Sequence, residues 1–189
     1  IAIVTGAIRH EGTTPQYLPI EFPAIANHQL VNALVAGAQK LGYDYHLGVS
    51  HTKDNFYGEI EMERMPLANE LKSLWNAWVA GGAVCSEMEA SAIFILASIH
   101  RKRAGGVMTI VGSDTETLKA KRYSSDAMIE VAVEAIKLMI QADKGLNPQA
   151  DSLYNARGRY WSASARCWGE IFSEPARSAI VRASLRMRW

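Results

Sequence analysis

The chain has 189 residues, of which 49% are hydrophobic and 21% charged, with a formal net charge of +1. These values are typical of a folded globular protein and exclude an intrinsically disordered one. No segment reaches the roughly 18 consecutive apolar residues of a membrane span, and the first residues lack the layout of a signal peptide, so we expect a cytoplasmic location. Cys85 and Cys167 lie far apart without metal-ligand spacing, so we expect neither a disulfide framework nor a metal site.

The charge is divided unevenly along the chain. Residues 1–144 hold 13 basic and 16 acidic side chains, whereas residues 145–189 hold seven Arg, no Lys and three acidic side chains. A helix stop and a breaker, Gly145 and Pro148, separate the two regions. We therefore expect one domain over residues 1–144, followed by an Arg/Trp-rich tail over residues 145–189.

The hydrophobic pattern of the first region alternates between strands and helices, which predicts an α/β sandwich. The strand over 105–113 is the clearest buried strand, and the helix over 127–142 is apolar on most faces, so we expect it to be largely buried. The predicted strands cover 1–8, 43–52, 83–86 and 105–113, and the predicted helices cover 28–41, 67–80, 89–100 and 127–142. Because the first strand begins at once, without a start methionine, we expect part of the sheet to lie upstream.

Two carboxylates flank a methionine in the segment Glu87-Met88-Glu89, where the pattern changes from strand to helix. At such a junction side chains can face a crevice at the carboxyl edge of a sheet. Spacing alone also fits a simpler interpretation, in which both carboxylates cap the helix and favour its dipole.

The run over 84–92 resembles the E-M-E signature of the uridine and purine nucleoside phosphorylase family. Four further segments match that family in the same order, over 9–13, 21–24, 54–57 and 131–137. The resemblance covers residues 1–144. It implies a phosphorylase/hydrolase-like three-layer sandwich with a central mixed sheet, of which the N-terminal portion is missing.

The resemblance implies phosphorolysis of a nucleoside to a free base and ribose 1-phosphate, with inorganic phosphate as co-substrate and no metal or other cofactor. It also implies a homo-oligomer, and no nucleic-acid or membrane partner. A related nucleosidase, which uses water in place of phosphate, is the alternative reaction. The family binds phosphate through residues that precede the segment matching Ile1. We therefore expect residues 1–189 alone to be inactive, and an inactive remnant is the third possibility.

By this resemblance Glu89 accepts hydrogen bonds from the ribose hydroxyls and Met88 packs under the sugar. Glu87 supports the same region. Phe56 stacks on the base, since an aromatic face accepts any flat ring. Ordinary core packing is the alternative for Phe56.

The base end of the expected site departs from the uridine enzymes at two positions. The segment Gly112-Ser113-Asp114 resembles the corresponding segment of the purine enzymes, in which the Asp protonates the purine at N7. That role requires a raised pKa for Asp114. A Ser-Asp turn leaving a strand is the alternative. Glu59 stands where the uridine enzymes carry a Gln, and a Glu cannot supply both a donor and an acceptor. The choice between pyrimidine and purine stays open.

The remaining features carry weaker signals. The histidines show no triad or metal spacing, so we expect them to be structural or superficial; they are His10, His28, His46, His51 and His100. Arginines among apolar residues over 176–189 are compatible with a basic helix. We favour translated sequence from outside the family as the origin of the tail.

Overall fold

The computed structural model describes residues 1–112 and 124–145. The chain divides into two units, Ile1–Gln141 and Ala142–Trp189, and the described residues lie almost entirely in the first. The elements in chain order are β1 (Ala2–His10), η1 (Thr14–Gln16), β2 (Ala24–Ile25), α1 (His28–Leu41), β3 (His46–Lys53), α2 (Tyr57–Ile60), η2 (Met62–Arg64), α3 (Ala68–Ala80), β4 (Ala83–Glu87), α4 (Ala90–Ile99), β5 (Gly106–Met108) and α6 (Asp126–Gly145).

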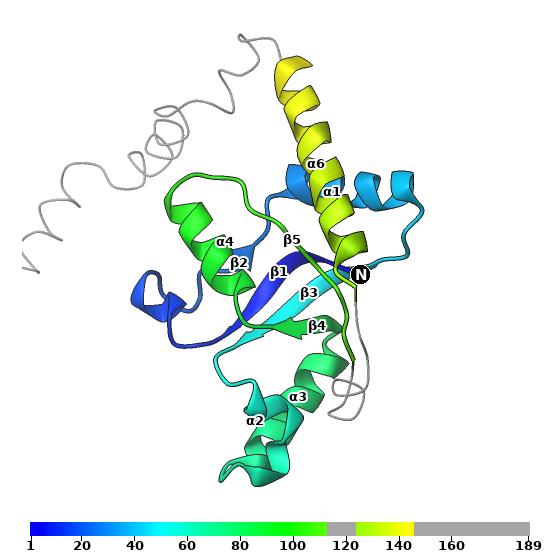
Figure 1. The fold of residues 1–189 in the computed structure, drawn as a ribbon. Coiled ribbons are helices and arrows are strands. Elements are labelled where there is room, and N and C mark those ends of the chain that lie inside the picture. Colours follow the sequence, from blue (N-terminus) through cyan, green and yellow to red (C-terminus); the bar gives the residue numbers. More distant parts are fainter. Residues whose placement is uncertain (113–123, 146–189) are drawn as a thin grey trace, which may run out of the picture. The chain divides into compact units, whose positions relative to one another are not determined.

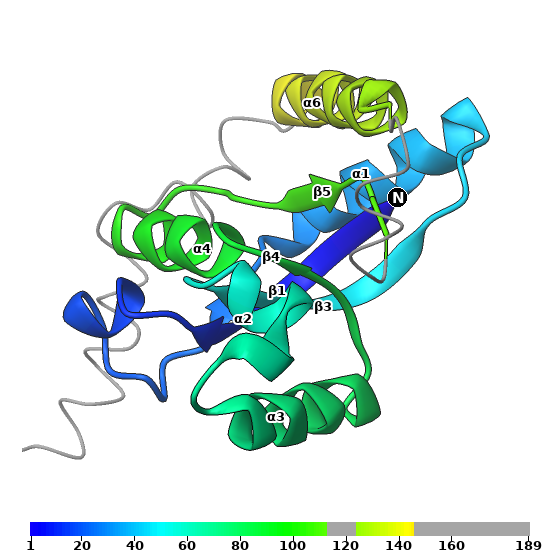
Figure 2. The ribbon, with the colours of Figure 1, turned by 60° about the horizontal axis from the view of Figure 1, so that its bottom comes forward.

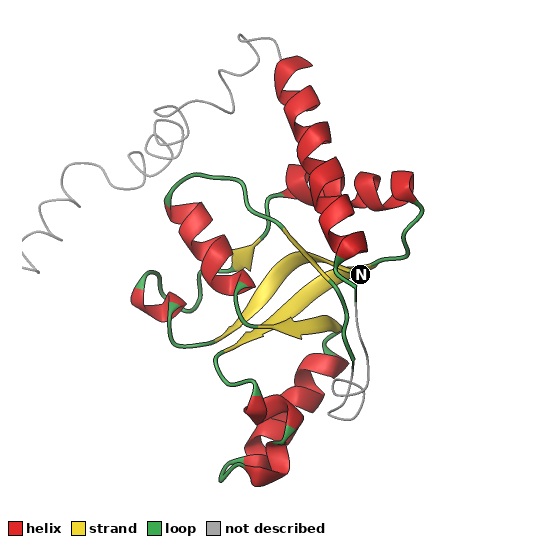
Figure 3. Cartoon of the chain, in the orientation of Figure 1, coloured by secondary structure: helices red, strands yellow, loops and turns green. Residues whose placement is uncertain are grey.

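The strands form a mixed sheet with helices on both faces (Figures 1 and 3). Its order is β2-β1-β3-β4, and β5 also pairs with β1. Strands β1, β3 and β4 are parallel, whereas β2 and β5 run antiparallel to β1. The expected α/β sandwich with a central mixed sheet is confirmed.

The register of the parallel strands brings their carboxyl ends to one edge of the sheet. His10 of β1 lies opposite Lys53 of β3, and Thr52 lies opposite Glu87 at the end of β4. Polar side chains that are far apart in the sequence are therefore neighbours at this edge, which is where parallel α/β sheets hold their ligands.

Two apolar clusters fix the helices to the sheet, one on each face of β1. Ile3 belongs to the cluster made with α1 and α6, and the next residue, Val4, belongs to the cluster made with α4. Figure 2 shows α4 separated from α1 and α6 by the strands. A Cβ added at Gly37 of α1 would lie 3.2 Å from the Val131 carbonyl oxygen, so this glycine allows α1 and α6 to pack closely.

Helix α1 begins and ends where its sequence predicts. The Asn27 side chain accepts a hydrogen bond from the Leu30 backbone N–H at 3.2 Å. Gly42 ends the helix with φ of +75°, a left-handed conformation that glycine adopts without a steric penalty.

Two expectations about the elements are wrong in part, and one short helical region was not predicted. Within the described residues, the strand expected over 105–113 is only Gly106–Met108, and it is half-buried. Its pairing with β1 ends opposite Ala2, and no strand of residues 1–112 or 124–145 pairs with the residues that follow Met108. Helix α6 buries only one face. The segment after Phe56, for which no helix was predicted, contains two short helical turns, α2 and η2.

The exposed face of α6 is apolar, which is why its pattern predicted burial. Its side chains are about half-exposed; they are Ile129 (52%), Val133 (46%), Ile136 (55%) and Ile140 (48%). Within the described residues, only the opposite face of the helix is covered, through Val131, Glu134 and Ala135.

We expect Asn27→Ala to lower the free energy of unfolding by about 1 kcal/mol, because it removes the acceptor for the first turn of α1. Asn27→Asp keeps an acceptor and serves as the control. Urea unfolding measures both variants, and equal losses for the two would contradict the capping role.

Candidate active site

Glu87 is the centre of a hydrogen-bond network at the carboxyl edge of the sheet. Its Oε1 accepts from the Ser50 hydroxyl at 2.9 Å and from the Thr52 hydroxyl. Its Oε2 accepts from the backbone N–H groups of Glu89, at 2.7 Å, and Ala90, at 2.6 Å. Glu87 therefore joins β3 to the first turn of α4, as the capping interpretation predicts for this residue.

Through Ser91 the network continues to Glu11, which directly follows β1. The Ser91 N–H donates to the Thr52 hydroxyl at 3.0 Å, and the Ser91 hydroxyl donates to Glu11 at 2.9 Å. Glu11 also accepts from the backbone and side chain of Thr14. Burial raises the pKa of Glu11, but these hydrogen bonds outweigh it, and the pKa lies below its ordinary value.

Arg9 holds the loop that follows β1. Its guanidinium donates to the Thr14 hydroxyl at 3.0 Å and to the carbonyl oxygens of Leu18, Pro19 and Phe22. Four acceptors in one loop fix its path, so the Pro-containing segment after β1 is tied to the same edge as Glu87.

Met88 and Glu89 project from this scaffold into solvent. Met88 is 39% exposed, and Glu89 is the exposed residue that precedes α4. In the described part of the chain the Glu89 carboxylate has no hydrogen-bond or ion-pair partner. Glu87 and Glu89 thus differ in role: one carboxylate is occupied in holding the backbone, and the other is available to a ligand.

On the other side of β4, Ser86 connects to a buried ion pair. Lys53, which is 6% exposed, pairs with Glu59 and donates to the Ser86 hydroxyl at 2.6 Å. The Ser86 hydroxyl donates to Glu59 at 2.6 Å. Glu59 is therefore linked through Ser86 to the Glu87-Met88-Glu89 segment. Sequence analysis did not predict Lys53 as part of the site.

Phe56 and Glu59 line a common cavity of about 340 Å³. Phe56 is 40% exposed, so it is not ordinary core packing. The lining also includes residues 109–112, directly before Ser113 and Asp114 in the sequence. Asp114 itself lies outside the described residues, and its role stays a prediction.

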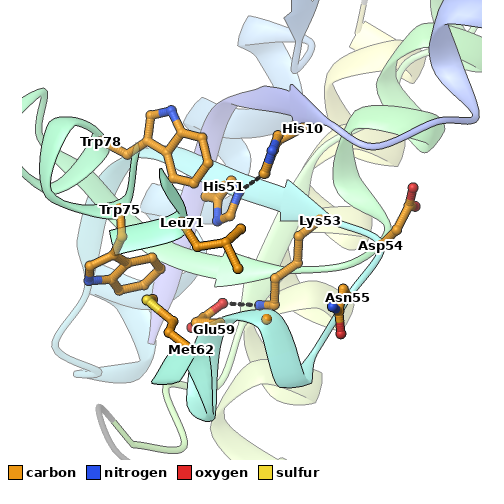
Figure 4. Close-up of a pocket in the computed structure, with 11 residues that line it drawn as sticks. His10, His51, Lys53, Asp54, Asn55, Glu59, Met62, Leu71, Trp75 and Trp78 are labelled. Carbon is orange, nitrogen blue, oxygen red and sulfur yellow. Dashed lines mark hydrogen bonds and ion pairs between the residues drawn. The ribbon is translucent and has the colours of Figure 1, made fainter. Parts of the chain in front are cut away.

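A histidine pair forms the wall of a second cavity of about 230 Å³ (Figure 4). His10 Nδ1 and His51 Nε2 are 3.1 Å apart, and the Trp78 ring stacks on His51 with centroids 3.9 Å apart. Trp75 lies at the edge of His51. Spacing in the sequence does not predict this pair, because it is the register of β1 and β3 that places the two histidines side by side.

The hydrogen bonds assign the protons of this cluster. The Ser86 hydroxyl has one hydrogen. It donates this hydrogen to the Glu59 carboxylate, 2.6 Å away, because a carboxylate is the strongest acceptor available to it. Ser86 Oγ then accepts from His51 Nδ1–H at 3.2 Å. His51 Nε2 accepts from His10 Nδ1–H, which makes His51 neutral. Burial, followed by the charges of His10 and Lys53, lowers the pKa of His51 to about 4 against the opposing effect of Glu59.

Comparison with known proteins identifies the family. A family model described as the phosphorylase superfamily matches residues 1–144. The chain belongs to that superfamily. The resemblance expected from the E-M-E segment is confirmed.

Of three similar proteins, two are named uridine phosphorylase and one is named guanosine phosphorylase. The chain is 40% identical over 147 residues to the uridine phosphorylase of Treponema pallidum. The matched segment covers 76% of this chain and 57% of the relative. It is 31% identical over 148 residues to the uridine phosphorylase of Thermococcus kodakarensis, over 76% of this chain and 52% of the relative. It is 28% identical over 141 residues to the guanosine phosphorylase of Halorubrum lacusprofundi, over 75% and 54%. The chain therefore spans just over half the length of these relatives.

Residues 1–112 and 124–145 show no metal site and no membrane span. They contain no group of three or more His, Cys, Asp or Glu side chains that could hold a metal ion. No helix of theirs combines the length and the hydropathy that crossing a membrane requires.

We expect Glu87→Ala and Glu89→Ala to have very different effects on stability. Glu87→Ala leaves two hydroxyls and two helix N–H groups without their acceptor, which lowers the free energy of unfolding by about 2–3 kcal/mol. Glu89→Ala changes it by less than about 0.5 kcal/mol, because its carboxylate is exposed and unpaired. Urea unfolding of both variants measures this difference, and similar losses would contradict the division of roles.

We expect the stability of the protein to fall as the pH is lowered from about 7 to about 5. Unfolded His51 takes up a proton near its ordinary pKa of 6.5, whereas folded His51 does so only near 4, so acid favours the unfolded chain. Urea unfolding at several pH values measures the slope.

His51→Gln is the control, and it removes most of that slope. The pKa values of Glu11 and Glu134 lie below 4.5, so the contributions of these carboxylates change only at lower pH. An unchanged slope in the variant would show that His51 titrates normally in the folded protein.

Proposed function

We propose that this protein acts as a nucleoside phosphorylase, which converts a nucleoside and inorganic phosphate to a free base and ribose 1-phosphate. One observation carries the proposal. Glu87 holds the backbone N–H of Glu89, whose side chain is exposed, and by resemblance the E-M-E segment of this superfamily is the ribose contact. A carboxylate on the ribose hydroxyls makes charge-assisted hydrogen bonds, which are stronger than neutral ones.

The proposed reaction places phosphate on C1′ of the ribose while the bond from C1′ to the base breaks. The electron pair of that bond leaves with the base, so positive charge develops on the sugar and negative charge on the base. Glu89 would orient the sugar, Met88 would pack under it and Phe56 would stack on the base. Asp114 would donate a proton to a departing purine.

Phosphorolysis, rather than hydrolysis, is favoured by the relatives, which are named phosphorylases. The proposal includes a homo-oligomer, which the resemblance implies and the exposed apolar face of α6 supports. It includes a cytosolic location, and no cofactor besides the phosphate co-substrate.

We expect Glu89→Ala to weaken the binding of uridine or inosine by about 10-fold or more, since it removes a charged acceptor for ribose hydroxyls. Isothermal titration calorimetry without phosphate measures the affinity. Glu70→Ala removes an exposed carboxylate on α3 and serves as the control, with unchanged binding. Equal binding by Glu89→Ala and the unaltered protein would contradict the ribose contact.

The products of turnover identify the type of reaction. We expect turnover only when the phosphate-binding residues that precede Ile1 in the family are present. With uridine or inosine and inorganic phosphate, it should then yield ribose 1-phosphate, detected by phosphorus NMR. Base release that proceeds without phosphate and yields free ribose would favour the nucleosidase instead.

A further inference from the structure

The buried ion pair between Lys53 and Glu59 faces the cavity that Phe56 lines. Both side chains lie in its wall, and the Lys53 ammonium is 6.0 Å from the centroid of the Phe56 ring. Burying a lysine is costly unless its charge is compensated. Such a pair at a cavity wall therefore requires an explanation beyond stability.

Counting donors and acceptors shows what the pair leaves available. Lys53 has three N–H groups, and Glu59 and Ser86 accept from it. Glu59 Oε2 takes the contacts with Lys53 and Ser86. In the described part of the chain, no partner occupies the third N–H of Lys53 or the Oε1 of Glu59. No fully buried side-chain N or O atom there lacks a partner, so Oε1 of Glu59, a residue that lines the cavity, is not fully buried.

We propose that Lys53 and Glu59 together read the lactam edge of a nucleobase. Glu59 accepts the ring N–H, and Lys53 donates to the adjacent carbonyl oxygen. The inference rests on the proposed function, because it assumes that a nucleoside base lies on Phe56.

The division between two side chains accounts for the absence of a glutamine. A Gln amide offers a donor and an acceptor in one group, whereas a carboxylate only accepts. Here the ammonium of Lys53 supplies the donor. The two groups come from different elements, β3 and α2, and Ser86 binds both. Their order along the base edge is therefore fixed, whereas a Gln amide can turn over.

This arrangement selects for a chemical class of base rather than for ring size. Uracil, hypoxanthine and guanine all present a ring N–H beside a carbonyl oxygen. Cytosine and adenine present an unprotonated ring nitrogen at that position, whose lone pair would face the Glu59 carboxylate. The relatives named uridine and guanosine phosphorylases act by name on nucleosides of uracil and guanine, which share the lactam edge.

The ammonium also suits the chemistry of the departing base. As the electron pair of the C1′–N bond moves into a lactam base, negative charge spreads to its carbonyl oxygens. A cation already placed beside one such oxygen stabilises this charge without reorganisation. An amino group in place of the carbonyl would gain nothing from Lys53.

A panel of ligands tests the inference on the unaltered protein, by calorimetric titration without phosphate. We expect uridine and inosine to bind at least about 10-fold more tightly than cytidine, adenosine and 3-methyluridine. In 3-methyluridine both carbonyls remain and only the ring N–H is lost, so this ligand isolates the contact with Glu59. Equal binding of uridine, cytidine and 3-methyluridine would overturn the inference and leave the proposed function standing. If none of the nucleosides binds, both fail.

Two variants test the side chains. Glu59→Gln supplies an N–H that can donate to the ring nitrogen of cytosine, so we expect the preference for uridine over cytidine to fall towards one. Lys53→Met should weaken uridine binding at least about 10-fold. Glu63→Gln and Lys72→Met are matched changes at exposed positions and should leave the preference unchanged.

Thermal unfolding checks that each variant is folded. If Lys53→Met does not fold, the ligand panel and Glu59→Gln still decide the question. A folded Glu59→Gln protein that retains the full preference for uridine would contradict the reading of the ring N–H by Glu59.

Discussion

The Glu87 carboxylate holds the sheet and helix α4 together, and the rest of the site depends on it. It accepts from two hydroxyls of β3 and from the first N–H groups of the α4 turn. A carboxylate suits this place because it can accept several hydrogen bonds and lies at the positive end of the helix dipole. Because the backbone of Met88 and Glu89 is fixed in this way, an exposed Glu89 side chain has a defined position from which to bind a sugar.

Neighbouring residues at this edge of the sheet contact different polar groups, because their side chains point to opposite faces. Along β3, Ser50 and Thr52 contact Glu87, whereas His51 and Lys53 contact Ser86. This alternation follows from the pleat of a strand. The proposed sugar contact and the proposed base contact are thus positioned by adjacent residues of β4, which couples the two ends of the site through a few hydrogen bonds.

Much of the fold follows from local sequence, but the polar clusters do not. Asn27 and Gly42 delimit α1 because capping is a property of a few neighbouring residues. The short β5 and the exposed face of α6 depend instead on which partners lie opposite. The roles of Lys53 and His51 arise from strand register and long-range contacts, which motif spacing alone does not predict. The signal in the sequence is that two polar residues, His51 and Lys53, occupy alternate positions near the end of a strand.

A crystal structure of the protein with bound uridine would test the account most directly. The account predicts that the uracil ring lies against Phe56, with its N3–H on Glu59 and a carbonyl oxygen on Lys53. It also predicts that the ribose hydroxyls contact Glu89. A nucleoside seated elsewhere, with neither Glu59 nor Glu89 in contact with it, would contradict the account.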